Sequence, residues 1–449
     1  YRNLKERAPA TPRTIYGMAS MTKSFTALGI HRLQESRLLK VTDPVVRHLP
    51  EFGTPEPRWT RRIQVHHLLS NSSGLPPLPL IYYTSARSLA RDPPYDPKVA
   101  RRVGIDPDHR PIDTYEEIME YLRTTRYRML GPPGRFFSYS NEAFGLLGAI
   151  IERASGQHYE SFIEQEILRP AGMDRTTFDT GVMFRSPEVT TLYSPNWTAR
   201  RKQWSASEEW WDDTCLRASG GLRTNIEDLQ RYLEIYRTGG LVGRERIVDR
   251  KSVEAMMRPH VPISPGLFYG YGLAVQPDFQ GTLLVNHSGG LKGVSSKFAV
   301  LPRKGLAGAV LANAEGVPSG RALAAGLNQL LGVPMSLDWV HIARHPPFPA
   351  SLSEYAGWYC SGEGIWVRVR AARSRLRLDF MGIEETEKGA LFSPNGGDDF
   401  VRGGRGREEH IRFERDARGR IWAVFLGWRL VRRRTKDQLR KARSGKMEW

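Results

Sequence analysis

The first clear pattern in the chain is a run of apolar residues at helical spacing. Phe25, Leu28 and Leu33 follow that spacing and predict a helix from position 20 to about position 39. Ser20 stands where this helix would begin, a place that favours serine. Because side chains three positions apart in a helix nearly overlie each other, Ser20 and Lys23 are expected on one face.

Capping signals and composition predict further elements. Thr114 and Glu117 form a capping box before an amphipathic run. Thr224 and Glu227 form a second capping box ahead of another helix. The stretch 76–111 is rich in Pro, Arg and Tyr and only weakly periodic, which predicts a long surface loop or lid.

Short apolar runs punctuated by Gly or Pro predict two groups of β-strands. The first group predicts neighbours in an antiparallel sheet, at residues 273–275, 283–285, 298–301 and 308–311. The second group follows prolines within 346–349 and predicts a small antiparallel β-barrel, at residues 366–369, 376–380, 411–413 and 421–425. We therefore expect a helix-and-sheet domain over 1–335, a linker over 336–350, a barrel over 351–431 and a basic tail over 432–449.

Length and composition agree with a globular, multidomain chain. A chain of 449 residues is too long for one ordinary core, and its 40% hydrophobic content is typical of globular proteins. No uninterrupted apolar stretch is long enough to cross a bilayer. Cys215 and Cys360 lie on opposite sides of the expected linker, which argues against a disulfide framework. With no secretory signal pattern at its start, the chain is expected in a reducing, cytoplasmic compartment.

The formal net charge of +18 raises the question of a polyanionic partner. Basic residues are spread along the sequence, apart from a dense run from Arg432 to Lys446. We interpret that run as a solvated, frayed extension rather than a nucleic-acid or targeting site. No nucleic-acid partner is expected.

The segment Ser20-Met-Thr-Lys23 holds residues suited to nucleophilic catalysis. A serine hydroxyl needs a base to become a nucleophile, and burial can lower the pKa of a lysine enough for it to serve. Taken alone, the same four residues are more often a helix cap beside a solvated lysine.

Two later segments supply complementary groups. Tyr139-Ser-Asn141 offers a phenol that can relay a proton and an amide that can bind a carbonyl. His287-Ser-Gly-Gly290 follows a predicted strand, and its glycines allow a substrate backbone to approach closely. A core tyrosine, a capping asparagine and a structural histidine are the ordinary alternatives for these residues.

The joint order of the three segments resembles the signature of serine β-lactamases and penicillin-binding proteins. The chain resembles the class C β-lactamase-like family, also called the S12 peptidases, which includes D-aminopeptidases, DD-carboxypeptidases, esterases and acyl transferases. The likeness covers about residues 14–332 and includes Ser219-Gly-Gly-Leu222. It implies an α/β (α+β) sandwich, in which an antiparallel sheet packs with a helical subdomain.

The resemblance also implies chemical roles. Ser20 would be the acylated nucleophile, with Lys23 and Tyr139 as the proton-transfer pair. Backbone N–H groups of Ser20 and Gly290 would form the oxyanion hole, where each donor is worth about 3 to 4 kcal/mol.

The resemblance implies that the remaining residues of the signature bind the substrate. Asn141 would bind the substrate carbonyl, and His287 and Gly289 would line the site. A histidine in the third segment resembles esterases and D-aminopeptidases more than true class C β-lactamases, so antibiotic hydrolysis is not the first expectation. Asn71 stands where many relatives have histidine, without an expected catalytic effect.

Two regions outside the signature leave alternatives open. Residues 352–359 resemble the start of a lipocalin-like barrel, which in relatives mediates oligomerisation or closes over the site; its other interpretation is a stabilising appendage. Trp204, Trp210 and Trp211 would shape an apolar substrate site or pack between domains. Only nineteen residues precede Ser20, fewer than in relatives, so N-terminal strands are expected to be missing.

The sequence therefore predicts a serine hydrolase that cleaves an ester or amide in a small molecule or peptide. One alternative is an acyl transferase on the same site, with an alcohol or amine replacing water. The other is a catalytically silent binding or scaffold protein that retains the signature as a relic. No metal or organic cofactor is implied, because there is neither a clustered His/Cys pattern nor a glycine-rich phosphate loop.

Overall fold

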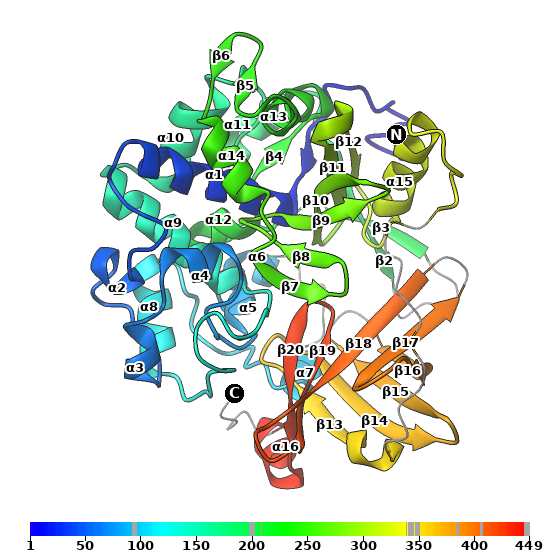
Figure 1. The fold of residues 1–449 in the computed structure, drawn as a ribbon. Coiled ribbons are helices and arrows are strands. Elements are labelled where there is room, and N and C mark those ends of the chain that lie inside the picture. Colours follow the sequence, from blue (N-terminus) through cyan, green and yellow to red (C-terminus); the bar gives the residue numbers. More distant parts are fainter. Residues whose placement is uncertain are drawn as a thin grey trace.

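The computed structural model describes residues 1–91, 97–196, 203–207, 209–337, 339, 345, 351–382, 386–404 and 407–443. A larger unit of helices and strands packs against a smaller β-barrel, drawn in yellow to red in Figure 1. The prolines expected to link these units, within 346–349, lie outside the described residues.

A six-stranded antiparallel sheet forms the centre of the larger unit. Its strands, in spatial order, are β12 (Leu306–Ala312), β11 (Val294–Leu301), β10 (Thr282–Leu291), β9 (Ala274–Phe279), β8 (Leu267–Tyr269) and β7 (Val261–Ser264). All of the apolar runs predicted for this sheet fall on β9 to β12, so the antiparallel sheet is confirmed. The helices α13 (Ile226–Thr238) and α15 (Ser319–Leu330) pack against β11 and β12.

The segment that carries Ser20 lies beside this sheet. Ser20 belongs to a 3₁₀ turn, η1 (Ala19–Met21), which leads directly into α1 (Thr22–Glu35). The helix ends earlier than the sequence predicted, and it packs against α9 (Asn141–Ser155). The apolar residues of the predicted pattern are all buried in the core: Phe25, Leu28 and Leu33.

Shorter elements complete the larger unit. Its other helices include α2 (Val45–His48), α3 (Pro57–Thr60), α4 (Val65–Leu69), α8 (Tyr115–Thr124), α10 (Tyr159–Ile163), η2 (Glu164–Leu168), α11 (Thr180–Phe184), η3 (Thr214–Leu216), α12 (Arg217–Gly220), α14 (Arg250–Met256) and η4 (Pro302–Lys304). Two-stranded pairs join β1 (Tyr16–Gly17) to β4 (Arg223–Thr224), β2 (Leu192–Asn196) to β3 (Gln203–Ser207) and β5 (Leu241–Val242) to β6 (Glu245–Arg246). None of the helices within the described ranges combines the length and apolar character needed to cross a membrane.

The prediction of a long surface loop over 76–111 is wrong. This stretch forms α5 (Leu80–Thr84), α6 (Ala86–Arg91) and α7 (Pro97–Arg102). Leu78 and Leu80 are fully buried in the main core. Helices of five or six residues are too short to show helical periodicity in a sequence, so these three helices leave no pattern that predicts them.

One of the two predicted capping boxes is confirmed. Thr114 accepts a hydrogen bond from the Glu117 amide, and the Glu117 side chain caps in return. At the second position the prediction is wrong, because the Asn225 side chain caps α13 by accepting from the Asp228 amide at 2.8 Å. Thr224 is a strand residue of β4 instead.

The C-terminal unit is a closed, eight-stranded antiparallel barrel, which confirms the predicted β-barrel. Its first turn is η5 (Leu352–Tyr355), and its strands are β13 (Gly357–Cys360), β14 (Trp366–Ala372), β15 (Arg375–Met381), β16 (Thr386–Pro394), β17 (Asp399–Gly404), β18 (Arg407–Arg415), β19 (Ile421–Leu426) and β20 (Arg429–Arg434). Pairing of β13 with β20 closes the barrel.

The prediction of a frayed basic tail from Arg432 is wrong for its first residues. Arg432, Arg433 and Arg434 belong to β20, where they pair with β13. The chain then forms α16 (Lys436–Arg443). The remaining expected tail residues, 444–449, lie outside the described residues.

Candidate active site

The backbone turn that presents Ser20 is strained and tightly held. Ala19 has a φ of 46°, in the left-handed region that costs a residue with a side chain about 1 kcal/mol or more. The preceding residue fixes the turn, because the Met18 amide donates to the Leu222 carbonyl at 3.0 Å. The Ser296 hydroxyl donates to the Met18 carbonyl at 2.7 Å. Strain of this kind is often found at functional sites.

Gly289 of β10 allows this turn to lie directly on the sheet. A Cβ atom at Gly289 would lie 2.0 Å from the Met18 carbonyl oxygen, so no larger residue fits without movement. A Cβ at Gly290 would meet no atom within 4 Å. Strand β10 pairs with β9 as far as Asn286, and among the described residues no strand pairs with the rest of β10 on that edge. Ser20 therefore lies beside the end of β10 that contains Gly289 and Gly290.

The amine of Lys23 is fully buried behind Ser20. Its Nζ lies 3.3 Å from the Ser20 Oγ and donates to the Asn141 Oδ1 at 2.8 Å and to the Ser219 carbonyl at 2.7 Å. Burial lowers the pKa of Lys23 well below its ordinary value, and the Arg429 guanidinium lowers it further. A neutral amine has two N–H groups and one lone pair, so with both N–H groups engaged the lone pair is left for the Ser20 hydroxyl.

Asn141 and Tyr139 reach the site from the start of α9. Ser140 caps this helix through its side chain, which accepts from the Ala143 amide, so Asn141 is the first helical residue. The Asn71 Oδ1 accepts a hydrogen bond from the Ser140 amide at 3.0 Å. Asn71 therefore holds the segment between the two site residues, a structural role that the sequence did not predict.

Tyr139 is a neutral phenol at ordinary pH. Burial raises its pKa above the usual value, while a hydrogen bond with Ser20 and the nearby Arg429 guanidinium offset part of that rise. The Lys23 Nζ lies 4.7 Å from the centre of the Tyr139 ring. A protonated phenol beside the nucleophile can pass a proton, but Lys23 is the stronger base of the two at rest.

His287 is buried and tied into the sheet. Its Nδ1 donates to the Ser288 carbonyl at 2.7 Å, so its Nε2 accepts from the Tyr269 hydroxyl at 3.0 Å. Burial is the largest cause that lowers the pKa of His287, which falls to about 3. The ring is therefore neutral and offers no cation for a substrate carboxylate.

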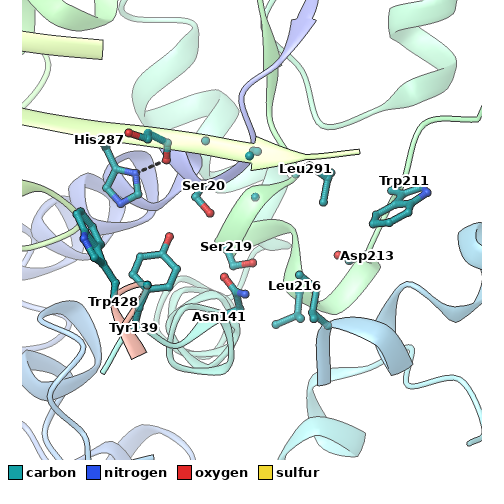
Figure 2. A pocket seen from close by; sticks show the side chains of 18 of the residues that line it. Ser20, Tyr139, Asn141, Trp211, Asp213, Leu216, Ser219, His287, Leu291 and Trp428 are labelled. Carbon is teal, nitrogen blue, oxygen red and sulfur yellow. Dashed lines mark hydrogen bonds between the residues drawn. The ribbon is translucent and has the colours of Figure 1, made fainter. Parts of the chain in front are cut away.

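These residues border one pocket of about 620 Å³ (Figure 2). The predicted residues that line it are Ser20, Tyr139, Asn141, His287, Gly289 and Gly290, and Lys23 lies behind them. Of the tryptophans, Trp211 lines the pocket, Trp210 is buried in a neighbouring cluster and Trp204 is exposed on β3. The pocket therefore brings together every predicted site residue.

The barrel contributes to this pocket through the turn between β19 and β20. Leu426 pairs with Arg429, and the two turn residues, Gly427 and Trp428, have φ values of 53° and 66°. Positive φ at both positions is typical of a type I′ turn, which rarely accepts a tryptophan. The Trp428 carbonyl accepts a hydrogen bond from the Tyr139 amide at 2.8 Å. The turn is thus attached to the segment that carries the site tyrosine.

Arg429 brings a charge from the barrel to the site. Its guanidinium lies 4.7 Å from the centre of the Tyr139 ring, and its Nε donates to the Glu363 carboxylate at 2.7 Å. The Glu363 side chain is only 8% exposed, and its other oxygen has no hydrogen bond within the described part of the chain. Arg429 therefore neutralises a buried carboxylate and acts on the site electrostatically.

The sequence did not identify Asn71, Trp428, Arg429 or Asp213 as site residues, although all of them support or line the pocket. Trp428 and Arg429 lie nearly three hundred positions after Tyr139 in the chain, so only the three-dimensional contact between barrel and sheet reveals them. The pair Gly427-Trp428 between two strand-like runs is the one local pattern here that indicates a tight hairpin turn.

Replacing Gly289 tests the close approach of the Ser20 turn. We predict that Gly289→Ala lowers the free energy of unfolding by about 1 to 3 kcal/mol, because the new methyl group overlaps the Met18 carbonyl. Gly290→Ala is the matched control and should leave unfolding unchanged, since its Cβ points into open space. Equal urea-unfolding curves for the two variants would contradict the packing described here.

Replacing Arg429 tests the buried ion pair. We predict that Arg429→Met lowers the free energy of unfolding by about 2 to 3 kcal/mol, because it leaves the buried Glu363 carboxylate without its positive partner. Adding Glu363→Gln should recover part of that loss, since it removes the buried charge. Arg420→Met breaks an exposed ion pair of the same barrel and should have a much smaller effect on stability. Thermal unfolding measures all of these variants, and a double variant no more stable than Arg429→Met alone would contradict the pairing.

Known proteins are similar to this chain in sequence and in fold. Residues 1–332 match the family model described as Beta-lactamase. Penicillin-binding protein 4* of Bacillus subtilis (strain 168) is 25% identical over 300 residues, which cover 66% of this chain and 60% of that protein. Protein flp of Staphylococcus aureus (strain MW2) is 29% identical over 178 residues, covering 40% of this chain and 31% of its own length. The chain thus matches less than two thirds of either curated relative.

Solved structures extend the likeness to the barrel. The octameric penicillin-binding protein homologue from Pyrococcus abyssi is 29% identical, with a TM-score of 0.63 over 96% of this chain and 91% of that one. SurE with D-Leu shares the fold at 23% identity, with a TM-score of 0.64 over 96% of this chain and 90% of that one. Together with the match of the family model to most of its length, these similarities show that the chain belongs to the beta-lactamase family of serine hydrolases and penicillin-binding proteins.

Proposed function

We propose that this protein hydrolyses an ester or amide through an acyl-enzyme on Ser20. The observation that carries the proposal is the arrangement of Lys23, whose N–H groups are engaged by Asn141 and Ser219 while its Nζ lies 3.3 Å from the Ser20 Oγ. The geometry suits a neutral lysine that takes the proton of a serine hydroxyl.

In the acylation step, the Ser20 proton moves to the Lys23 Nζ as the Ser20 Oγ bonds to the substrate carbonyl carbon. The negative charge that develops on the carbonyl oxygen is stabilised by the backbone N–H groups of Ser20 and Gly290. The bond to the leaving alcohol or amine then breaks. Tyr139 relays the proton from Lys23 to that leaving group, which restores the neutral lysine.

In the deacylation step, a water molecule attacks the acyl carbon and gives up a proton through the same pair, Lys23 and Tyr139. The bond to the Ser20 Oγ breaks, the serine regains a proton and a carboxylic acid leaves. Asn141 has its Oδ1 engaged by Lys23, so its amide N–H groups are the part available to a substrate carbonyl. This agrees with the role expected from the sequence.

The neutral His287 supports esters and amides that lack a carboxylate next to the scissile bond. With a pKa lowered to about 3, this histidine supplies no positive charge at the position where β-lactamases of class C hold a substrate carboxylate. The pair formed by Arg429 and Glu363 does not replace it, because that guanidinium already has its own carboxylate partner.

Covalent labelling tests the proposal. A fluorophosphonate should add to the intact wild-type protein and fail to add to Ser20→Ala, as measured by intact mass. Lys23→Ala and Lys23→Arg should slow labelling at least about 100-fold, because neither alanine nor a protonated guanidinium accepts the Ser20 proton. Labelling of Ser20→Ala at the wild-type rate would contradict the assigned nucleophile.

The pH dependence of the labelling rate tests whether Lys23 acts as a neutral base. The reactive state has a neutral lysine, so the rate should rise with pH through the pKa of Lys23 and level off above it. Because burial lowers that pKa, the plateau should be reached well below pH 10.5, the ordinary value for lysine. A rate that keeps rising up to that pH would contradict a neutral Lys23 at rest.

A further inference from the structure

The wall of the pocket opposite the nucleophile carries a carboxyl group. Figure 2 shows Ser20, Tyr139 and His287 on one side and Asp213, Trp211, Leu216 and Leu291 on the other. Asp213 directly precedes η3 (Thr214–Leu216). The buried core residues of that turn fix its position. It has no part in the acyl transfer proposed above.

The Asp213 carboxyl forms no ion pair within the described part of the chain, although the charges of Arg223 and Arg217 act on it. Its Oδ1 accepts a hydrogen bond from the Ser85 hydroxyl of the segment between α5 and α6. Its Oδ2 makes neither a hydrogen bond nor an ion pair with any of the residues that the structure describes. Burial, followed by the negative charge of Asp212, raises the pKa of Asp213 to about 7. A carboxylate is therefore costly here until a cation joins it.

The basic groups near Asp213 are already engaged elsewhere. Arg217 pairs with Asp212 at 2.5 Å and with Glu160 at 3.0 Å. Arg223 donates to the Phe178 carbonyl at 2.7 Å and lies 3.6 Å from Asp212. Asp212 thus has two arginine partners, whereas Asp213 lines the pocket and forms no ion pair with any described residue.

We propose that Asp213 binds an ammonium group of the substrate, so that the preferred acyl groups carry a free amine. This inference rests on the proposed hydrolase function and names its substrate class: amino-acyl esters or amides, including peptides with a free N-terminus. Trp211 and Leu216, which flank the carboxyl, provide an aromatic and an aliphatic surface for the carbon skeleton of such a group. A substrate that places its amine on Asp213 and its carbonyl at Ser20 spans the pocket from wall to wall.

A binding experiment with a variant that cannot turn over substrate tests the subsite apart from the chemistry. In the Ser20→Ala protein, calorimetry compares phenylalaninamide with N-acetylphenylalaninamide, and 6-aminohexanamide with hexanamide. The first pair probes an α-amine and the second a terminal amine on a longer chain. In at least one pair, we expect the free amine to bind at least about tenfold tighter, the effect of about 1.4 kcal/mol from one sheltered ion pair.

Adding Asp213→Asn should abolish that preference, whereas Asp113→Asn, which breaks an exposed ion pair with Arg87, should preserve it. Equal binding of amine and control amides, no binding of either at millimolar concentration, or a preference that survives Asp213→Asn would each overturn the inference. The comparison between ligands needs no Asp213 variant, so it stands even if that variant fails to fold. Fluorophosphonate labelling of the wild-type protein tests the hydrolase function separately, so failure of one is distinguishable from failure of the other.

Discussion

The burial of one amine, the Nζ of Lys23, is the constraint on which the rest of the site depends. A lysine without contact with water is costly in its charged form, so it holds its proton weakly. Two acceptors on different elements, Asn141 at the start of α9 and the carbonyl of Ser219 in α12, fix the direction of its lone pair. The turn that holds Ser20 must then approach β10 closely enough to meet that lone pair, and only glycine at position 289 permits it.

The barrel contributes directly to the site around Ser20 and Lys23. Its β19–β20 turn accepts a hydrogen bond from the backbone of Tyr139, and Arg429 brings a positive charge over the tyrosine ring. That charge lowers the pKa of Lys23 and is itself held by the buried Glu363. A mixed aromatic and aliphatic cluster joins the two units at this point. The barrel therefore shapes both the wall of the pocket and its electrostatics.

How much could be predicted from the sequence depended on how local each signal was. Ser20 and Lys23 share a helix turn, and the strands of the sheet and barrel have their own periodicity, so these features were accessible. The sequence predicts the cap of α13 one position too early, because Thr224 and Asn225 are both good capping residues and the strand pairing of Thr224 leaves Asn225 as the cap. Trp428, Arg429 and Asp213 belong to the site through contacts between distant segments, and no local pattern in the sequence encodes such contacts.

The protonation state of Lys23 is the most direct test of the account. Lysine labelled with ¹³C at Cε, with Lys23→Arg protein to assign the signal, reports this state by NMR across a pH titration. A Lys23 signal that titrates well below pH 10.5, the ordinary value for lysine, is the predicted result. A signal that titrates near pH 10.5, as an exposed lysine does, would contradict a resting base at this position and with it the proposed activation of Ser20.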